Sequence, residues 1–216
     1  MKKLIEGILE FRNSLTEENR ALFADLALGQ KPNALFIACS DSRVVPNLFA
    51  STNPGDLFVL RNVGNLVPSY AHQDTGTLAA LEFAVLSLKV KDIVVCGHSE
   101  CGAMQSLINQ TKSSCCSHLP AWLSHAESCL SNQTHISFSS DELASHNKAS
   151  QMNVLEQIDH LISYPFIEDL VNKKALRLHG WWFDIARADV YCYESNVAQF
   201  KMIDQQEAKL ILARLG

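Results

Sequence analysis

Residues 93–102 read IVVCGHSECG, and this stretch decides the fold and the chemistry expected of the chain. Its first part, Ile93 to Cys96, is a short apolar run typical of a buried strand. The run leads directly into His98 and Cys101, which are near enough in sequence to bind one metal ion together. Imidazole and thiolate are ligands that zinc prefers, so the stretch predicts a strand that ends in a zinc site.

A second apolar run ends in a similar way. Residues 34–38 read ALFIA and indicate another buried strand, which is followed by CSDSR at residues 39–43. If the two strands lie side by side, Cys39 is the third zinc ligand and the fourth position stays free for water. Cysteines in apolar surroundings are often only small core residues. The charged residues Asp41, Arg43 and Glu100 beside the candidates argue against a purely structural core.

Composition and charge narrow the function classes. The 216 residues are 47% hydrophobic and 19% charged, as in an ordinary globular protein of one domain. A net charge of -5 argues against a nucleic-acid binder, and no apolar run reaches membrane-spanning length. The sequence LIEG at residues 4–7 interrupts the apolar run that a signal peptide would need. The seven cysteines lack the layout of a disulfide-rich scaffold, so we expect a cytoplasmic protein.

Strand patterns alternate with helix patterns through most of the chain, which predicts an α/β fold with a mainly parallel central sheet flanked by helices. Ligands bind such sheets beyond the carboxyl ends of the strands, where Cys39 and His98 both fall. The expected strands are residues 34–38, 56–60, 93–96 and 175–185, with 190–193 as the hairpin partner of the last. The expected helices are residues 4–11, 16–29, 76–90, 102–109, 152–164, 166–171 and 204–215. Thr16, with Asn19 three residues later, is the expected cap of the second helix.

We expect a single domain over residues 1–216 with two distinctive parts. Residues 1–30 form a helical N-terminal arm that is apolar on one side, so it packs either on the chain's own core or on a second subunit. Residues 111–150 are rich in Ser, Asn and Gln, which is typical of a solvated variable segment. A metal site there is disfavoured, because CxxC and HxxxH spacings are missing and the adjacent Cys115 and Cys116 would share an ion with poor geometry.

Asp41 lies two residues beyond Cys39, a spacing that lets its carboxylate turn back toward the open face of the metal. It would then either accept a hydrogen bond from metal-bound water or bind the metal itself and close the site. A two-pronged guanidinium contact from Arg43 would keep Asp41 ionised and oriented. Without a metal nearby, the same residues would form an ordinary turn with a surface ion pair.

Together the motifs closely resemble those of the β-class carbonic anhydrase family. The resemblance is carried by CSDSR at 39–43 and HSECG at 98–102, and it extends to FVLRNVGN at 58–65, Gly76-Thr77 and LHGW at 178–181. It covers nearly the whole chain except roughly residues 111–150. It implies that Cys39, His98 and Cys101 bind one zinc ion (Zn2+) per subunit, and that Asp41 and Arg43 form the catalytic dyad.

The resemblance also implies the reaction, which is the reversible hydration of carbon dioxide to bicarbonate and a proton by attack of zinc hydroxide. It further implies a homodimer or a dimer of dimers, joined by the N-terminal helices, with no nucleic-acid or membrane partner. Position 83 is commonly Tyr in the family, so a hydroxyl contact is missing here. The implied substrate-binding residues are Gln30 from the dimer partner, the apolar residues Phe58, Val63 and Phe83, and the backbone amide of Gly102.

Some members of the family close their site by binding bicarbonate in a pocket of Trp, Arg and Tyr. The matching residues here are Phe36, Arg61 and Phe183, so two hydrogen-bond donors are missing. Each lost bond in a buried site costs roughly 1–3 kcal/mol. We therefore expect weak bicarbonate binding and an open site in which Asp41 is bound to Arg43.

Other zinc proteins share parts of the pattern. Alcohol dehydrogenases also use a Cys-His-Cys zinc site, but the GxGxxG turn of a dinucleotide fold is missing from this sequence. Zinc deaminases share the His-x-Glu of HSE, but their PCxxC partner is missing as well. Two alternatives stay open: a closed structural zinc with Asp41 as its fourth ligand, and a hydrolase of carbon disulfide or carbonyl sulfide on the same scaffold. Two interpretations of His72 also stay open: it is either a proton shuttle or a solvated loop residue.

Overall fold

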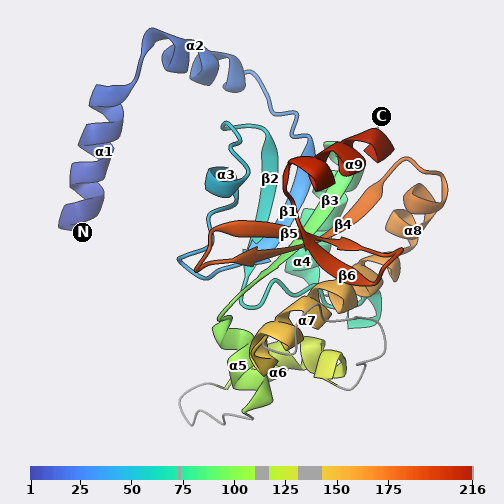
Figure 1. Cartoon of the computed structure of the whole chain (residues 1–216). Coiled ribbons are helices and arrows are strands. Elements are labelled where there is room, and N and C mark those ends of the chain that lie inside the picture. The colour runs from blue at the N-terminus through green and yellow to red at the C-terminus, as the bar shows by residue number, and fades with distance from the viewer. Residues whose placement is uncertain (73, 110–116, 131–142, 216) are drawn as a thin grey trace. The chain divides into compact units, whose positions relative to one another are not determined.

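The computed structural model describes residues 1–72, 74–109, 117–130 and 143–215, and the chain forms two compact units (Figure 1). The first unit, Met1–Lys31, contains two helices, α1 (Lys2–Ser14) and α2 (Glu17–Leu26). As the sequence predicted, Thr16 caps α2. Its hydroxyl accepts the amide of Asn19 at 3.1 Å, and the Asn19 side chain accepts the Thr16 amide in return. These reciprocal bonds satisfy amides that the first helical turn leaves unpaired.

The N-terminal unit does not bury its apolar side chains within itself. No residue of α1 or α2 is buried. Phe11 and Phe23 join the two helices through an edge-to-face contact with ring centroids 6.1 Å apart. Four further apolar side chains of α1 are exposed, namely Leu4, Ile5, Ile8 and Leu9. A contiguous apolar surface of this kind is typical of a site that another protein surface covers.

The second unit, Pro32–Gly216, is built around one six-stranded sheet with the strand order β2-β1-β3-β4-β5-β6. The first four strands in this order pair in parallel, and β5 and β6 add an antiparallel edge. The predicted α/β class with a mainly parallel sheet is therefore confirmed. The strands are β1 (Ala34–Cys39), β2 (Leu57–Asn62), β3 (Asp92–His98), β4 (Arg177–Asp184), β5 (Asp189–Glu194) and β6 (Gln199–Met202).

The strands β1 and β3 lie next to each other inside the sheet and are buried at every residue except the first. Strands that are covered on both faces need apolar side chains at every position, which explains why their sequences do not alternate. Their register pairs Phe36 with Val94 and Ala38 with Cys96. Because the pairing is parallel, both strands end at the same edge of the sheet.

The helices of the second unit lie around this sheet (Figure 1). The sequence predicts neither α3 nor β6, because a four-residue element is too short to establish a periodic pattern. No helix among the described residues is long and apolar enough to cross a membrane. The helical segments are α3 (Pro46–Phe49), η1 (Tyr70–His72), α4 (Thr75–Glu82), η2 (Phe83–Ser87), α5 (Gly102–Ile108), α6 (Leu119–Leu123), η3 (Ser124–Leu130), α7 (Ser145–Ile162), α8 (Pro165–Asn172) and α9 (Gln205–Leu215).

Two helices differ from their predicted bounds. The helix predicted for residues 76–90 is α-helical only in α4 and continues as the wider π-helical segment η2. Soon after η2 the chain leaves the helical path, where Lys89 has a left-handed φ of 57°. The helix predicted from Met152 begins at Ser145 instead. Its first two turns are mainly polar, so they lie outside the apolar pattern from which the helix was predicted.

Part of the segment predicted to be variable, residues 111–150, is described by the structure. Its residues 117–130 include α6 and η3, and η3 packs beside α7. Three of its side chains are buried in a cluster with Met152 of α7, namely Leu123, Ala126 and Cys129. Cys115 and Cys116 lie outside the described residues, so the expectation about them stays a prediction.

The helix α7 packs across β3 and β4 at very short range. A Cβ atom added at Gly97 of β3 would lie 2.8 Å from Val154 Cγ2, and one added at Gly180 of β4 would lie 3.1 Å from Val154 Cγ1. Glycine within a strand often marks such a close approach of another segment. The two glycines therefore leave room for α7 to pack so closely that its side chains can form hydrogen bonds with the backbone of the sheet.

Glu156 of α7 is a largely buried carboxylate beside η3. It accepts hydrogen bonds from the Ser128 hydroxyl and the Cys129 amide, while its Oε2 atom has no hydrogen-bond partner among the described residues. Burial raises the pKa of Glu156 to about 7, and Asp159 acts in the same direction. His160 Nε2 lies 3.8 Å from Glu156 Oε1, but burial lowers the pKa of this imidazole, so it is neutral near pH 7.

We predict that Glu156→Gln raises the free energy of unfolding above pH 7. This gain should become smaller as the pH falls toward 4.5. The folded-state pKa of about 7 lies above the ordinary value of 4.5, so the carboxyl group supports folding only while it is protonated. Its ionisation then weakens the fold progressively between these two pH values. We expect a gain of roughly 1–3 kcal/mol in the free energy of unfolding at pH 8, measured by urea denaturation.

Glu168→Gln is a suitable control, because it makes the same chemical change at an exposed position of α8. Because Glu168 lies in the first turn of α8, its replacement should cost less than about 1 kcal/mol, and this effect should be equal at pH 5 and pH 8. A gain in Glu156→Gln that is equally large at pH 5 and pH 8 would contradict the assignment.

Candidate metal centre

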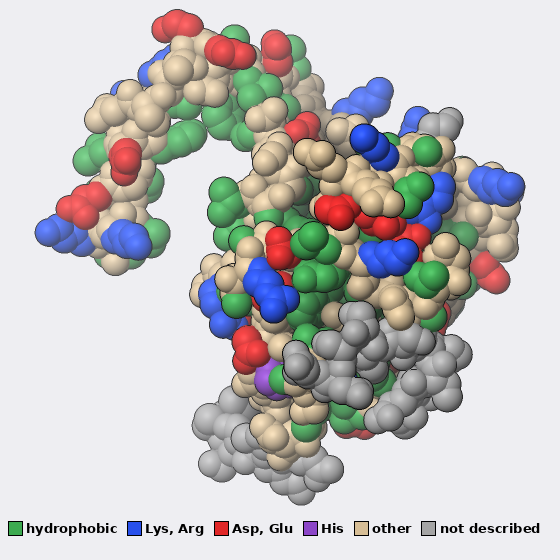
Figure 2. All heavy atoms as spheres, viewed as in Figure 1, with side chains coloured by type: hydrophobic (Ala, Val, Ile, Leu, Met, Phe, Trp, Pro, Cys, Tyr) green, Lys and Arg blue, Asp and Glu red, His purple; other side chains and the backbone are tan. Residues whose placement is uncertain are grey.

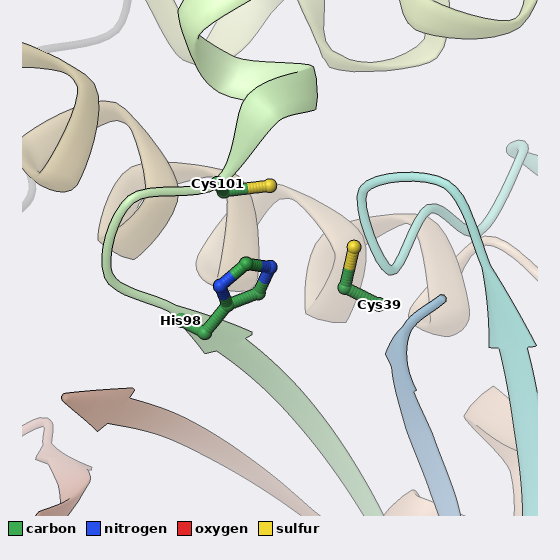
Figure 3. Close-up of side chains that lie close together, drawn as sticks. All are labelled: Cys39, His98 and Cys101. Carbon is green, nitrogen blue, oxygen red and sulfur yellow. The ribbon is translucent and has the colours of Figure 1, made fainter. Parts of the chain in front are cut away.

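The three predicted metal ligands meet at the carboxyl edge of the parallel strands. Cys39 is the last residue of β1, His98 is the last residue of β3, and Cys101 directly precedes α5. Figure 3 shows their side chains pointing toward a common space. Their ligand atoms lie within 4.8 Å of one another, and all three residues are buried. A tetrahedral zinc ion holds sulfur and nitrogen ligands about 3.3–3.8 Å apart, so small adjustments suffice to bind it.

The hydrogen bonds of His98 leave one ring nitrogen for a metal. Nδ1 lies 2.8 Å from the carbonyl oxygen of Ser99, which can only accept a hydrogen bond, so Nδ1 carries the proton. Nε2 then presents a lone pair, and this buried atom has no hydrogen-bond partner among the described residues. A buried polar atom without a partner is costly. A metal ion bound at Nε2 would remove that cost.

The two thiols influence each other's ionisation. Their mutual contact lowers the pKa of Cys39 against the opposing effect of burial, and the Gly64 amide lowers it further. The same contact, together with burial, raises the pKa of Cys101. A divalent cation would deprotonate the second thiol as well. Two sulfurs and one imidazole form a ligand set typical of zinc, so the residues present fit this ion.

The loop at residues 62–66 supplies a hydrogen bond to the centre. The Gly64 amide donates to Cys39 Sγ at 3.4 Å. Gly64 has a φ of 83°, and an added Cβ would lie 3.2 Å from the Cβ of Ala103, so both conformation and space favour glycine. The Asn62 side chain closes the loop through two hydrogen bonds of 2.7 Å to the backbone of Leu66.

Asp41 and Arg43 make the two-pronged contact described above as an expectation. Arg43 donates Nε–H to Asp41 Oδ1 at 2.9 Å and Nη2–H to Oδ2 at 2.7 Å, and its backbone amide donates to Oδ1 at 2.9 Å. The guanidinium holds the pKa of Asp41 well below its usual range. Nη2 also donates to the carbonyl of Glu100 at 3.0 Å. The pair is thereby tied to the loop between His98 and Cys101.

Arg61 of β2 holds the turn that carries Cys39 and Asp41. Its guanidinium donates to the Cys39 carbonyl at 2.9 and 3.1 Å and to the Asp41 carbonyl at 2.7 Å. Phe36 and Phe183 both pack against Phe49, and the ring of Phe183 is stacked on that of Phe49 at 4.6 Å. These two positions offer aromatic rings and no hydrogen-bond donors. Weak bicarbonate binding stays a prediction.

The residues expected to bind substrate lie on several elements of the second unit, and Phe58 pairs with Leu35, four residues before Cys39. Phe58 of β2 contacts Phe83 of η2 with ring centroids 5.8 Å apart. Val63 is exposed, and its carbonyl accepts the indole N–H of Trp122 at 2.8 Å. Gly102 begins α5, and a Cβ added there would meet nothing within 4 Å. Packing therefore does not require glycine at position 102.

Two further candidates come from other segments of the chain than the metal-ligand candidates. Gln30 belongs to the N-terminal unit, and its proposed role in a partner's site stays a prediction. His72 is exposed in η1, where its Nδ1 lies 2.9 Å from the Ser69 hydroxyl. Its ring also contacts that of His125 edge to face, with centroids 4.8 Å apart. No described contact joins His72 to the three metal-ligand candidates.

Comparison with known proteins identifies the family. A family model described as Carbonic anhydrase matches residues 34–190. Among solved structures, the β-carbonic anhydrase CcaA matches with a TM-score of 0.82 and 39% sequence identity, covering 94% of this chain and 98% of that one. The chain belongs to the β-class carbonic anhydrase family.

Two further comparisons agree with this assignment. A carbonic anhydrase of Pseudomonas aeruginosa is 44% identical over 189 residues, which cover 86% of this chain and 84% of that protein. A solved structure described as one of two tetrameric β-carbonic anhydrases from Sordaria macrospora matches with a TM-score of 0.77 and 31% identity, covering 88% of this chain and 95% of that one. Similarity at this level over most of each chain shows that this protein is a carbonic anhydrase enzyme.

The sequence analysis missed a set of residues on α7 that contact the metal centre of this carbonic anhydrase. Ser150 forms hydrogen bonds with the backbone of His98, and Asn147 accepts the amide of Glu100. A recurrence of polar residues at spacings of three was visible in the sequence. It could not be distinguished there from a solvated helix face, because partners so distant in sequence leave no local signal.

We predict that Cys39→Ser, His98→Ala and Cys101→Ser each abolish tight zinc binding, because each removes one of three protein ligands. The measurement is the zinc content of purified protein after dialysis against a chelator. Cys96→Ala is a matched control, because this buried thiol of β3 packs near Phe36 and Phe183 rather than at the centre. The control should retain zinc. A full complement of tightly held zinc in Cys101→Ser would exclude that residue as a ligand.

Proposed function

We propose that this carbonic anhydrase catalyses the reversible hydration of carbon dioxide to bicarbonate and a proton with a zinc ion held by Cys39, His98 and Cys101. The observation that supports this most is the buried Nε2 of His98, which lies beside two thiols and has no hydrogen-bond partner in the described part of the chain. When bound, zinc would lower the pKa of a water molecule in its fourth position and so supply a nucleophile near neutral pH.

Asp41 orients that nucleophile in this proposal. An ionised carboxylate only accepts hydrogen bonds, so it binds the proton-bearing side of the water and leaves a lone pair directed at the substrate carbon. Three bonds from Arg43 support this role, because they keep Asp41 ionised and fix its position. The bond from Arg43 to the Glu100 carbonyl holds the pair beside the ligand loop.

The substrate would bind against apolar side chains. Carbon dioxide has no hydrogen-bond donor and no net charge, and the contacting rings of Phe58 and Phe83 suit such a molecule. We assign Val63 and the backbone amide of Gly102 to the same pocket, and Gln30 of a second subunit to its rim. Phenylalanine at position 83 offers no hydroxyl, so orientation of the substrate depends on the Gly102 amide and Gln30.

A closed structural zinc site is the main alternative, and it would need Asp41 as the fourth ligand. Asp41 is not part of the group of metal-ligating atoms that lie within 4.8 Å of one another. Binding zinc would break its charge-assisted contact with Arg43, and such bonds are among the strongest that side chains form. This arrangement favours an open site with a fourth position for water.

We further propose that the active form is a dimer or a dimer of dimers. The uncovered apolar face of α1, formed by Leu4, Ile5, Ile8 and Leu9, supports a protein partner. The β-carbonic anhydrases of Sordaria macrospora, described as tetrameric, suggest that the partner is a second copy of the chain.

We propose a cytoplasmic location because the described cysteines are free thiols. The described cysteines are all free and buried, namely Cys39, Cys96, Cys101, Cys129 and Cys192. Free thiols are typical of a reducing compartment.

We predict that the zinc-loaded protein hydrates carbon dioxide in a stopped-flow assay, and that Asp41→Asn and Arg43→Ala lose most of this activity while retaining zinc. The amide introduced at position 41 would donate a proton toward the water and misorient it, and loss of Arg43 would release the carboxylate. Removing a single orienting group commonly lowers kcat by about 100- to 1000-fold.

Arg177→Ala is the matched control for the dyad variants. Arg177 makes a similar two-pronged contact with Asp92, at 2.7 and 2.9 Å, at the opposite end of β3. Its loss should leave kcat unchanged. Turnover close to that of the unaltered protein in Asp41→Asn would refute the role of the dyad.

We also predict that deletion of residues 1–29 yields inactive or aggregating protein, because it exposes the surfaces that the arms cover in the partner. A milder variant, Ile8→Asp, should shift the protein toward monomer in sedimentation velocity and lower its activity. Glu10→Gln, another change at an exposed position of α1, serves as the control. A fully active monomer after the deletion would contradict the proposed assembly.

A further inference from the structure

The helix α7 carries polar side chains on a face that is buried. Four of them recur at spacings of three and four residues, which places them on one side of the helix. Their exposed fractions are 8% or less. Burying an amide or hydroxyl is unfavourable unless it forms hydrogen bonds, and each of these side chains bonds to backbone outside α7 or to another member of the set. We call them the α7 polar stripe: Asn147, Ser150, Asn153 and Gln157.

The first half of the stripe holds the segment that carries His98 and Cys101. The Ser150 hydroxyl donates to the His98 carbonyl at 2.9 Å and accepts the His98 amide at 3.3 Å. Asn147 Oδ1 accepts the amide of Glu100 at 2.7 Å. Glu100 has a left-handed φ of 56°, a conformation that costs energy for a residue other than glycine. The bond from Asn147 therefore stabilises a strained turn between two metal-ligand candidates.

The second half of the stripe holds the loop that contacts Cys39. Asn153 Nδ2 donates to the carbonyl of Gly64 at 3.0 Å, and the Gly64 amide in turn donates to Cys39 Sγ at 3.4 Å. Gln157 Oε1 accepts the amide of Val67 at 2.8 Å. Its Nε2 donates to Asn153 Oδ1 at 2.9 Å, so the two amides of the stripe support each other.

The close packing of α7 makes these contacts possible. A Cβ at Gly97 would lie 3.0 Å from Ser150 Oγ, as well as 2.8 Å from Val154 Cγ2. The helix therefore reaches the backbone of β3 only because position 97 has no side chain. The indole N–H of Trp182 donates to Ser150 Oγ at 3.2 Å and fixes the hydroxyl from the neighbouring strand.

We propose that the α7 polar stripe positions the metal ligands, with one helix holding both segments from which they come. Ser150 acts through His98, and Asn153 acts through Gly64 on Cys39. The inference rests on the proposed zinc site and adds positioning residues that do not touch the metal. Groups that orient metal ligands in this way typically change metal affinity by about 10- to 100-fold when they are removed.

The test compares Ser150→Ala and Asn153→Leu with the unaltered full-length protein. Two properties report on the ligands without measuring activity. One is the rate at which zinc is released to a chromogenic chelator, and the other is the thiolate-to-metal charge-transfer band after cobalt(II) replaces zinc. Leu161→Ala is the control, because this fully buried residue of α7 belongs to the main hydrophobic core and its truncation destabilises the fold without removing a hydrogen bond of the stripe.

We expect zinc release to accelerate roughly 10- to 100-fold in both stripe variants. Only Asn153→Leu should move the charge-transfer band to longer wavelength, because a thiolate that loses an N–H donor is more easily oxidised. Leu161→Ala should lower the melting temperature while its zinc release and its band stay unchanged.

Two results would overturn the inference. One is unaltered zinc release and an unaltered band in both stripe variants, and the other is an equal acceleration of release in Leu161→Ala. An unaltered protein that takes up no cobalt would overturn the metal site itself, which is a different result from the failure of the stripe.

Discussion

The parallel pairing of β1 with β3 is the constraint on which the rest of the site depends. It ends both strands at one edge of the sheet and thereby brings Cys39 toward His98. The same pairing requires both strands to be buried, so the thiols and the imidazole lie where water is largely excluded. In such surroundings each charge interaction is stronger than in solvent. The short contact between Asp41 and Arg43 lies at the edge of this dry centre. Figure 2 shows acidic and basic side chains on the outer surface of the molecule.

Stability and function are linked through α7. Its Val154 packs against Gly97 and Gly180 in the core, and on the same helix Ser150 and Asn153 bond to segments that carry the metal-ligand candidates. Buried amides and hydroxyls weaken a core unless their hydrogen bonds are complete. The described partners of these side chains are the backbone of His98 and Gly64, the indole of Trp182 and the side-chain amide of Gln157. A core helix can therefore carry polar residues at little cost to the stability of the fold, provided that the neighbouring segments keep the conformation that supplies the hydrogen-bond partners.

Much of the fold could be predicted because its signals are local. Apolar runs of strand length marked β1 and β3, and the capping pair Thr16 and Asn19 marked the start of α2. The helix predicted for residues 76–90 changes to a π-helix at Phe83, which the apolar pattern does not reveal. The start of α7 was placed too late, because its first turns are polar. In both cases packing against other segments decided the structure, and a periodic pattern contains no information about that packing.

The sequence by itself determined which residues could serve as ligands. It set the short spacing between His98 and Cys101, and its motifs marked the family to which the chain belongs. Only the tertiary structure decided that Cys39 completes the group, that Nε2 of His98 is left without a partner among the described residues, and that α7 holds both ligand segments. The bond from Ser150 to His98 spans 52 residues, and the bond from Asn153 to Gly64 spans 89. Contacts at such separations depend on how the sheet and its helices pack, so no local pattern in the chain can specify them.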